Sequence, residues 1–286
     1  MMLIWQLTHT HQYVFFIFFG LITLMIGSFI NVLIYRLPIM LKQQWQSDCH
    51  VLLNLPEKPA SQVFNLWLPR SFCPSCNHTL SFYCNIPVLS WLILKRRCLY
   101  CQASISILYP AIEIMCCLLS LLAAWHFGID FLLIFISLFI WINIALFFID
   151  LEHFLLPDNL TLTLLWLGLI ANYYTLFTTL PEAMFSACGA YLVLWSIMQI
   201  FYLVTGKIGM GHGDFKLFAA YGAWFGWTKL PLILLVASLS GAIFGAIYLF
   251  FTRKGKNTPI PFGPFLCCSG LICLFTSQSS LISIFY

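Results

Sequence analysis

Two aspartates in this 286-residue chain have the neighbours that acid–base chemistry requires. Asp214 follows Gly209-Met210-Gly211-His212-Gly213, and glycines let backbone and substrate approach closely. Asp150 ends the apolar run Phe147-Phe148-Ile149, at a helix end where the dipole disfavours an anion. Two carboxylates that share one site do not easily ionise together, so one can act as acid and the other as base. We therefore predict that Asp150 and Asp214 form a catalytic pair, with Asp150 as its protonated member.

Four other polar residues near Asp150 have to be distinguished from it. Asp158 and Asn159 follow a proline and precede an apolar run, so either could cap the amino end of a helix. Glu152 and His153 lie on a connecting segment, where they can simply be solvated. Asp150 has no such explanation, so we choose it as the first aspartate and keep Asp158 as the alternative.

Four cysteines form a metal-binding pattern in the only sizeable polar region, residues 36–105. They occur as two Cys-x-x-Cys pairs with 21 residues between them: Cys73, Cys76, Cys98 and Cys101. That spacing resembles a zinc ribbon, in which four thiolates bind one zinc ion and stabilise a domain too small for its own core. Disulfides are the alternative, although a reducing cytoplasm disfavours them. His78 and Cys84 lie nearby and could replace one of the ligands.

Two helix ends carry polar residues that have both a structural and a functional explanation. Gly27, Ser28 and Asn31 suit close packing and hydrogen bonding between membrane helices, and Pro38 is expected to end that helix. Glu113 opens the next helix, where the dipole favours an acid, but it could also support the aspartates or pair with an arginine. The residues expected to support the aspartate pair are Gly211, Gly213, Lys216, Glu113 and Asp158.

The composition indicates that membrane helices position these groups. Hydrophobic residues make up 62% of the chain and charged residues only 8%, far outside the range of soluble proteins. Seven apolar runs are long enough to cross a bilayer, and an eighth is short. They cover residues 13–35, 106–127, 131–149, 160–178, 183–204, 229–251 and 262–284, with the short one near 215–227. Cysteines within such runs, including Cys267, are expected to act as small hydrophobic residues.

We therefore predict an all-α polytopic membrane protein with about eight transmembrane helices and a small zinc-ribbon-like domain between the first two. The expected parts are a first transmembrane helix over 1–35, a cytoplasmic Cys-rich domain over 36–105 and a transmembrane core over 106–286. The short run after Asp214 would tilt, stop partway or thin the bilayer. Each of these would let water reach that aspartate.

The basic residues predict the orientation in the membrane. An N-terminus outside places residues 36–105, 151–159, 205–214 and 252–261 on one side, and twelve of the thirteen Lys and Arg residues lie on or beside these loops. Positive residues mark the cytoplasmic side. Both aspartates would then lie at cytoplasmic helix ends. The net charge of +4 thus indicates topology, and we expect no nucleic-acid partner.

Taken together, these motifs resemble the type IV prepilin peptidase family of GxGD-type intramembrane aspartyl proteases. The resemblance rests on the two aspartate motifs, the two cysteine pairs and segments such as 27–38 and 109–113, and it covers nearly the whole chain. It implies that Asp150 and Asp214 activate a water and cleave the basic leader of type IV prepilins and type II secretion pseudopilins. Cleavage would occur at the cytoplasmic face of a bacterial inner membrane. Bifunctional members also methylate the new N-terminal residue with S-adenosylmethionine.

One departure from that family concerns methyl transfer. This chain has Lys95-Arg96-Arg97 where the family usually has a glycine between basic residues. An arginine at that position changes the backbone freedom beside the expected metal site, so a peptidase without methyltransferase activity is the alternative. No GxGxxG-like loop indicates a separate Rossmann domain, so the sequence does not locate the methyl-donor site.

Two other functional classes fit parts of the pattern. A cation-coupled transporter would also hold aspartates at helix ends, but it would need inverted repeats and sites at the bilayer midplane, which the sequence does not indicate. A non-catalytic assembly protein could use a zinc ribbon for docking. It would have no use for two glycine-rich aspartate sites.

Overall fold

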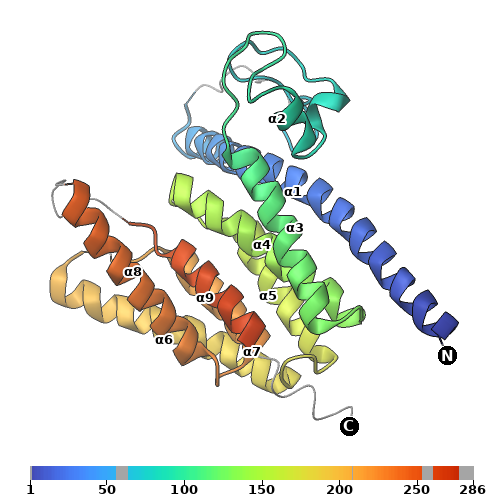
Figure 1. The fold of residues 1–286 in the computed structure, drawn as a ribbon. Helices are drawn as coiled ribbons and strands as arrows, with labels where there is room; N and C mark the ends of the chain where they lie inside the picture. Colours follow the sequence, from blue (N-terminus) through green and yellow to red (C-terminus); the bar gives the residue numbers. More distant parts are fainter. Residues whose placement is uncertain (1, 56–63, 208, 253–259, 277–286) are drawn as a thin grey trace. The chain divides into compact units, whose positions relative to one another are not determined.

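A computed structural model describes residues 2–55, 64–207, 209–252 and 260–276 of the chain (Figure 1). The chain forms two units, residues 1–125 and 126–286. The first contains α1 (Met2–Leu52), the 3₁₀ helix η1 (Phe82–Asn85), α2 (Leu89–Ile93) and most of α3 (Leu108–Phe127). The second contains α4 (Phe131–His153), α5 (Asp158–Tyr173), α6 (Leu180–Thr205), α7 (His212–Phe225), α8 (Leu230–Thr252) and α9 (Gly263–Thr276). The described residues form no named strand, only two isolated β-bridges, so the predicted all-α class is confirmed.

The first helix is longer than the sequence predicted. α1 continues through Pro38 to Leu52, so the prediction that this proline ends the helix is wrong. A proline inside a helix removes one backbone hydrogen bond and costs about 3 kcal/mol. Residues 39–52 contain neither glycine nor another proline and include many good helix formers. Their summed helix propensity offsets the cost of the proline.

α1 and α3 touch through the small and polar residues that the sequence singled out. A Cβ added to Gly27 would lie 2.7 Å from the Cα of Glu113, which is too close for any side chain. One turn farther along α1, the side-chain amide of Asn31 donates a hydrogen bond to the Tyr109 carbonyl at 3.0 Å. The prediction that this part of α1 serves helix packing is therefore confirmed.

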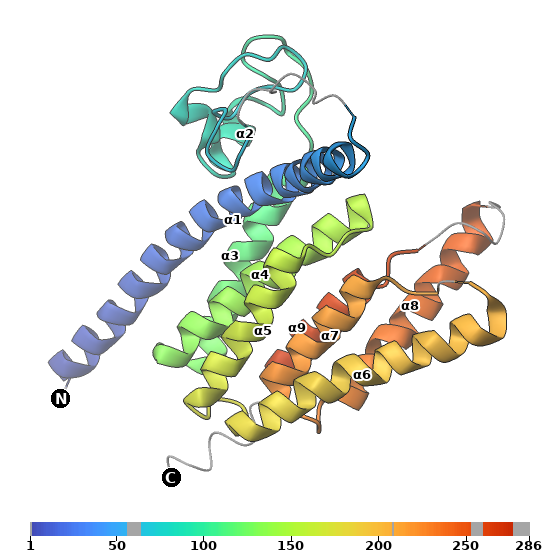
Figure 2. The ribbon, with the colours of Figure 1, turned by 180° about the vertical axis from the view of Figure 1, so that it is seen from behind.

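Within the second unit, the short helix α7 is enclosed by neighbouring helices (Figure 2). It packs against α5 and α6, while α4 contacts α5 and α9, and α8 contacts α9. Eleven of the fourteen α7 residues are buried, as expected of a helix that is apolar around most of its circumference. Gly222 permits this packing because a Cβ there would lie 2.6 Å from the Ser186 carbonyl oxygen of α6.

Hydrogen bonds between α5 and α7 hold the carboxyl-terminal end of α7. The indole Nε1 of Trp224 donates to the Leu164 carbonyl at 2.8 Å. The side-chain amide of Asn172 donates to the Ala223 carbonyl at 2.7 Å, which satisfies an acceptor that the helix end leaves open. The amino-terminal end of α7, which carries Asp214, is thus the start of a helix that is tightly fixed at its other end.

Five helices in the described part of the chain are long and apolar enough to cross a membrane. They lie at Gln12–Leu52, Leu108–Phe127, Phe131–His153, Leu180–Thr205 and Leu230–Tyr248. All eight expected segments contain a helix, but α5 has 16 residues and α7 has 14, so the count of about eight membrane crossings is not confirmed. Residues 277–284 of the last expected span lie outside the described residues.

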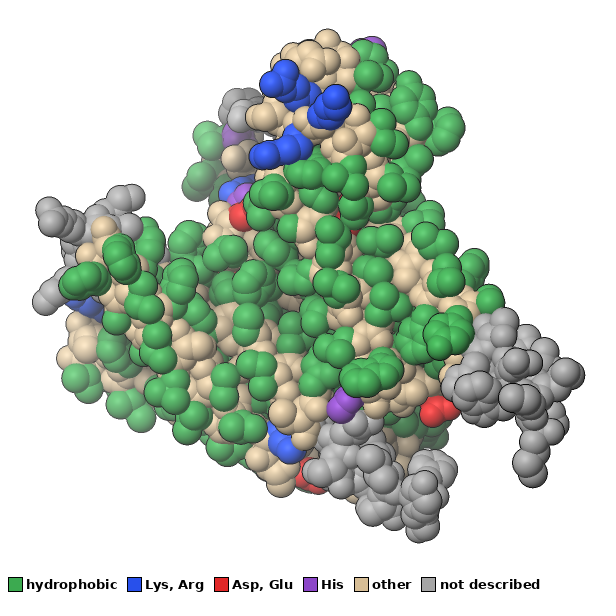
Figure 3. Space-filling view, viewed as in Figure 1, with side chains coloured by type: hydrophobic (Ala, Val, Ile, Leu, Met, Phe, Trp, Pro, Cys, Tyr) green, Lys and Arg blue, Asp and Glu red, His purple; other side chains and the backbone are tan. Residues whose placement is uncertain are grey.

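The surface of the helices differs in composition from that of the Cys-rich domain (Figure 3). Hydrophobic side chains cover most of the visible face of the helices. Lys and Arg side chains gather on the Cys-rich domain of the first unit, where Lys95, Arg96 and Arg97 are all exposed.

Candidate active site

Asp150 is the buried acid at the end of α4. It lies in the last turn of that helix and is only 6% exposed. The backbone N–H of Gly263, at the start of α9, hydrogen-bonds its carboxylate. A Cβ added to Gly263 would lie 2.5 Å from Oδ2 of Asp150, so only glycine leaves this carboxylate in place. The amino end of α9 therefore positions the first aspartate.

Asp214 is the buried acid at the start of α7, where the helix dipole stabilises a carboxylate. Its Oδ2 accepts a hydrogen bond from the N–H of the N-cap residue Gly211 at 3.2 Å, which is the acidic half of a capping box. Capping, which the sequence analysis did not expect of Asp214, therefore occupies one of its two oxygens. The other, Oδ1, is buried and has no hydrogen-bond partner among the described residues. Oδ1 is thus the oxygen available to water or substrate.

The two carboxylates share one site. Asp214, which is also 6% exposed, is subject to the electrostatic field of Asp150. Leu156, on the connection between α4 and α5, holds the helices around them. A Cβ on Gly213 would lie 2.7 Å from the Leu156 Cβ, and one on Gly263 would lie 3.1 Å from its Cδ1. Two glycines thus let α7 and α9 close on the same leucine, and the pair they hold has the composition of an acid–base dyad.

Asp158, the alternative first aspartate, has a different environment. Its side chain is 56% exposed, and its Oδ1 forms an ion pair with Nζ of Lys216 at 2.6 Å. It is the first residue of α5, whose N-cap is Pro157, so the expectation that Asp158 or Asn159 caps this helix is wrong. Pro157 still has an extended backbone, and the helix begins directly after it, at Asp158. This start is one residue earlier than an N-cap at Asp158 would give. Asp158 and Lys216 tie α5 to α7 at the surface.

The other polar residues that the sequence singled out have environments of their own. Glu152 is exposed, as expected of a solvated residue, and His153 is half-buried. Glu113 belongs to the first unit, where its Oε2 accepts a hydrogen bond from the Val88 N–H at 2.8 Å. It therefore has a partner in the Cys-rich domain that the sequence analysis did not foresee.

Three polar residues near the aspartates were not predicted from the sequence: Cys267, Tyr221 and Asn143. The buried Cys267, one turn after Gly263 on α9, is subject to the electrostatic fields of both aspartates and hydrogen-bonds Tyr221. The Tyr221 hydroxyl also contacts Oδ1 of Asn143 at 2.5 Å. Asn143 precedes Asp150 by two helical turns, and Tyr221 follows Asp214 by two. This equal spacing was the sequence signal that could have predicted a contact between Asn143 and Tyr221. The expectation that Cys267 acts only as a small hydrophobic residue is incomplete, because it also hydrogen-bonds Tyr221.

The four predicted metal ligands form one cluster. The Sγ atoms of Cys73, Cys76, Cys98 and Cys101 all lie within 4.8 Å of one another. The Sγ atoms of Cys73 and Cys101 are 3.8 Å apart, which is the separation of about 3.8 Å that tetrahedral Zn–S bonds of about 2.3 Å would require. All twelve cysteines of the chain are free, so the disulfide alternative is not supported. The donor set fits a structural zinc ion.

Each cysteine pair lies on a small hairpin of its own, and the two hairpins have the same geometry. Asn77 N–H donates to the Cys73 carbonyl at 2.8 Å, and Gln102 N–H donates to the Cys98 carbonyl at 3.1 Å. Asn77 and Gln102 both take left-handed backbone conformations, with φ of 56° and 59°. The bridges Phe72↔Thr79 and Arg97↔Ser104 close the two hairpins. The repeated geometry explains why two short, distant sequences deliver four thiols to one point.

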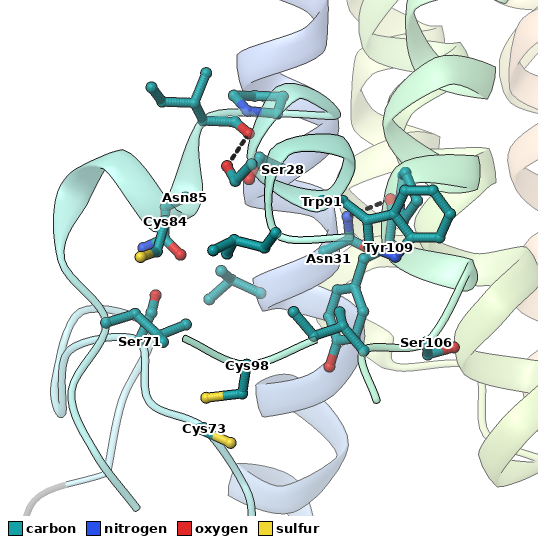
Figure 4. A pocket seen from close by; sticks show the side chains of 18 of the residues that line it. Ser28, Asn31, Ser71, Cys73, Cys84, Asn85, Trp91, Cys98, Ser106 and Tyr109 are labelled. Carbon is teal, nitrogen blue, oxygen red and sulfur yellow. Dashed lines mark hydrogen bonds between the residues drawn. The ribbon is translucent and has the colours of Figure 1, made fainter. Parts of the chain in front are cut away.

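The electrostatics of the cluster favour thiolate formation at one member. Burial alone would raise the pKa of the Cys73 thiol, but hydrogen bonds from the backbone of Cys76 and Ser75 and from neighbouring thiols lower it to about 6. A thiolate is the form that binds metal. His78 instead contacts the ring of Tyr100 in a tilted arrangement, with 3.7 Å between the ring centroids and 41° between the ring planes. Cys84 lies in a cavity wall apart from Cys73 and Cys98 (Figure 4). Neither belongs to the cluster.

The basic run before Cys98 has an unusual backbone. Lys95 and Arg96 take positive φ values of 49° and 65°. A residue with a Cβ is disfavoured in that region, whereas glycine is not. The guanidinium of Arg96 lies 5.5 Å from the centre of the Trp91 ring. The departure noted in the sequence therefore occurs where the backbone suits glycine.

Comparison with known proteins agrees with this geometry. Residues 21–127 match the model of the bacterial peptidase A24 N-terminal domain, and residues 136–246 match that of the type IV leader peptidase family. No solved structure matches the chain.

Curated relatives resemble the chain over most of its length. A protein of Legionella pneumophila is 53% identical over 91% of both chains. One of Stutzerimonas stutzeri is 49% identical over 88% of this chain and 87% of its own, and one of Pseudomonas aeruginosa is 47% identical over 89% and 88%. All three are named prepilin leader peptidase/N-methyltransferase. With its buried aspartate pair and its tetracysteine cluster, the chain belongs to the type IV leader peptidase family.

Proposed function

We propose that this protein removes the leader peptide from prepilins and then methylates the new N-terminus. The names of its curated relatives support both activities. The observation that carries the peptidase half is the pair of buried carboxylates, Asp150 and Asp214, one of which has an oxygen without a partner among the described residues. The substrates would be type IV prepilins and, by the family resemblance, type II secretion pseudopilins.

The aspartate pair supplies the chemistry of peptide hydrolysis. One carboxylate takes a proton from a water, whose oxygen adds to the scissile carbonyl carbon. The protonated partner donates to the carbonyl oxygen, and a proton then passes to the departing amine nitrogen as the C–N bond breaks. Oδ1 of Asp214 is suited to hold the water, because Oδ2 is already engaged by the Gly211 N–H.

Neighbouring residues would keep this pair in place. Gly211 supplies the backbone donor to Asp214, and Gly213 lets α7 approach Leu156. Lys216 and Asp158 would act farther out, by joining α7 to α5. In this proposal residues 106–286 form the peptidase core, residues 36–105 the Cys-rich domain and residues 1–35 a transmembrane helix.

A zinc ion bound by the four cysteines would stabilise the Cys-rich domain. The cluster is formed by two hairpins joined through η1 and α2, and this domain has few buried apolar residues. A closed four-thiolate site contributes folding free energy directly and leaves no position for catalysis. We assign the metal a structural role.

The distribution of basic residues supports an orientation for the enzyme. Twelve of the thirteen Lys and Arg residues would face the cytoplasm if the N-terminus were periplasmic. Asp150 and Asp214 would then lie at the cytoplasmic side of the inner membrane. A basic leader would be attracted to this acidic site, and the apolar stem of the pilin would lie among the helices.

The experiment that tests the function uses the purified full-length protein in detergent. It is incubated with a prepilin, with and without S-adenosylmethionine, and the product is analysed by mass spectrometry. We expect loss of the leader in both reactions and an added N-terminal methyl group only when the methyl donor is present. An intact prepilin would refute the peptidase. A shortened product that never gains a methyl group would favour the peptidase-only alternative, to which Arg96 points.

A further inference from the structure

The first unit contains a cavity that the peptidase chemistry does not use. Its volume is about 620 Å³, within the range of roughly 300–1,000 Å³ that is typical of small-molecule sites. α1, the Cys-rich domain and the first turns of α3 enclose it (Figure 4). Most of its wall is apolar, so the few polar groups that reach it determine what it can bind. We call it the Glu113 cavity.

A buried carboxylate lies in the wall of this cavity. Glu113 is 7% exposed, and its Oε2 accepts a hydrogen bond from the Val88 N–H at 2.8 Å. Ser28 of α1 also hydrogen-bonds this side chain. A carboxylate in an apolar wall is costly unless a cation compensates it, and the described residues place no lysine or arginine in an ion pair with Glu113. The cavity therefore favours a ligand with a positive charge.

A buried guanidinium lines the same cavity. Arg36 is 5% exposed, and its two terminal nitrogens donate to the carbonyl oxygens of Asn65 and Pro69 at 2.8 and 2.6 Å. The ion pairs among the described residues do not include it either. A cavity with one charge of each sign suits a small zwitterion better than a simple cation.

The wall also presents aromatic rings and an unsatisfied donor. Trp91 and Tyr109 both line the cavity, where Figure 4 shows them near Asn31. The indole Nε1 of Trp91 is buried and has no hydrogen-bond partner among the described residues. Buried donors are almost always satisfied, so an orphan in a cavity wall indicates an acceptor on a ligand. Flat rings beside it suit a planar, nitrogen-rich group.

We infer that the Glu113 cavity binds S-adenosylmethionine, with Glu113 facing its cationic part and the Trp91 N–H available to an acceptor atom. This inference rests on the proposed methyl transfer and deepens it. When bound, the donor supplies a methyl carbon: the substrate amine forms an N–C bond to it as the C–S bond breaks, the nitrogen loses a proton, and a neutral thioether remains. Glu113 and Arg36 would bind the charges, and the apolar wall would exclude water.

Binding to the purified full-length protein in detergent tests the site without any methylation assay. Isothermal titration with S-adenosylmethionine is compared for wild type, Glu113→Gln and Trp91→Phe. Gln keeps the acceptor for Val88 but removes the charge, so we expect binding at least 10-fold weaker. Phe keeps a ring but removes one donor, and a lost hydrogen bond of about 1 kcal/mol corresponds to about fivefold.

Matched controls lie outside the cavity. Glu182, in the first turn of α6, accepts a hydrogen bond from the Thr178 hydroxyl at 2.6 Å, and Trp166 is 62% exposed on α5. Glu182→Gln and Trp166→Phe should each change the affinity by less than twofold. Thermal unfolding of every variant identifies any that is misfolded. If both cavity variants are folded and bind like wild type, the inference is overturned.

Photolabelling of the wild type keeps the inference falsifiable if a variant does not fold. An azido derivative of S-adenosylmethionine is cross-linked, and the labelled peptide is identified by mass spectrometry. We expect adducts within residues 25–36 or 71–113, which line the cavity. Labelling confined to residues 126–286 would place the donor elsewhere. Wild type that cleaves prepilin but neither binds nor is labelled would instead refute the proposed methyl transfer itself.

Discussion

The aspartate pair and the cysteine cluster are assembled in opposite ways. Asp150 and Asp214 come from two helix ends, and a third helix contributes the Gly263 N–H. The four thiols come from two copies of one hairpin, each closed by its own backbone hydrogen bonds. The first site therefore depends on how α4, α7 and α9 pack. The second depends mainly on local turns and, in our proposal, on the metal between them.

This difference predicts how each site fails. A small change in helix packing should displace a carboxylate and lower the cleavage rate while the fold survives. Loss of a thiol should release the metal and loosen the whole Cys-rich domain, because this domain has few buried residues. Cleavage and methylation should consequently respond differently to mutations in the two regions.

The largest effect is expected from the aspartates themselves. Asp150→Asn and Asp214→Asn should each lower leader cleavage by about 10³-fold or more, because each removes one acid–base group. Each variant should still methylate a leaderless pilin, since methyl transfer does not need the dyad. Cleavage and methylation are scored separately by mass spectrometry of the processed pilin.

Asp158→Asn provides the matched control for these variants. Its exposed ion pair with Lys216 is worth at most about 1 kcal/mol, so cleavage should stay within a few-fold of wild type. If Asp158→Asn lost cleavage while Asp150→Asn kept it, our choice of the first aspartate would be wrong.

A smaller effect is expected at the glycine that supports Asp150. The methyl group of Gly263→Ala would lie 2.5 Å from Oδ2 of Asp150, which is closer than van der Waals contact allows, so this carboxylate would have to move. A displacement of about 1 Å at a catalytic group can cost about 100-fold, so we expect cleavage to fall by about 10- to 100-fold. Gly20→Ala is the control, because its nearest contact would be an ordinary 3.7 Å. Equal cleavage rates for the two variants would argue against this packing.

Residue types and spacing identified the residues that the structure brings together at both candidate sites, but not the residues that surround them. The four cysteines could be assigned because Cys-x-x-Cys is a local signal, and Asp150 because an acid in an apolar run needs an explanation. Tyr221 and Cys267 escaped because their contact depends on how α7 and α9 pack. The helix end predicted at Pro38 was wrong because the helix propensity of the residues that follow it outweighs the cost of one proline. The Glu113 cavity could not be predicted, since it forms between segments distant in the chain.

Metal loss should have an intermediate effect and separate the two activities. Cys73→Ser combined with Cys76→Ser should release the bound zinc, measured by elemental analysis, and make residues 64–105 sensitive to limited proteolysis. Methylation should fall more than cleavage, because the Cys-rich domain forms part of the Glu113 cavity. Cys188→Ser, an exposed cysteine outside the cluster, is the control. Carefully purified wild type without metal would contradict the zinc assignment.

The smallest effect is expected at Arg96, where the backbone is left-handed. Its φ of 65° favours glycine over any residue with a Cβ by about 1 kcal/mol. Arg96→Gly and Arg96→Ala both remove the contact with the Trp91 ring, so the difference between them isolates the backbone. We expect the Gly variant to be more stable by about 1 kcal/mol, measured as resistance of the Cys-rich domain to proteolysis at increasing urea. The same pair of substitutions at Arg97, whose φ is not positive, should give the opposite order, because glycine there only loosens the unfolded chain. An Arg96→Ala variant as stable as Arg96→Gly would show that this turn does not need glycine.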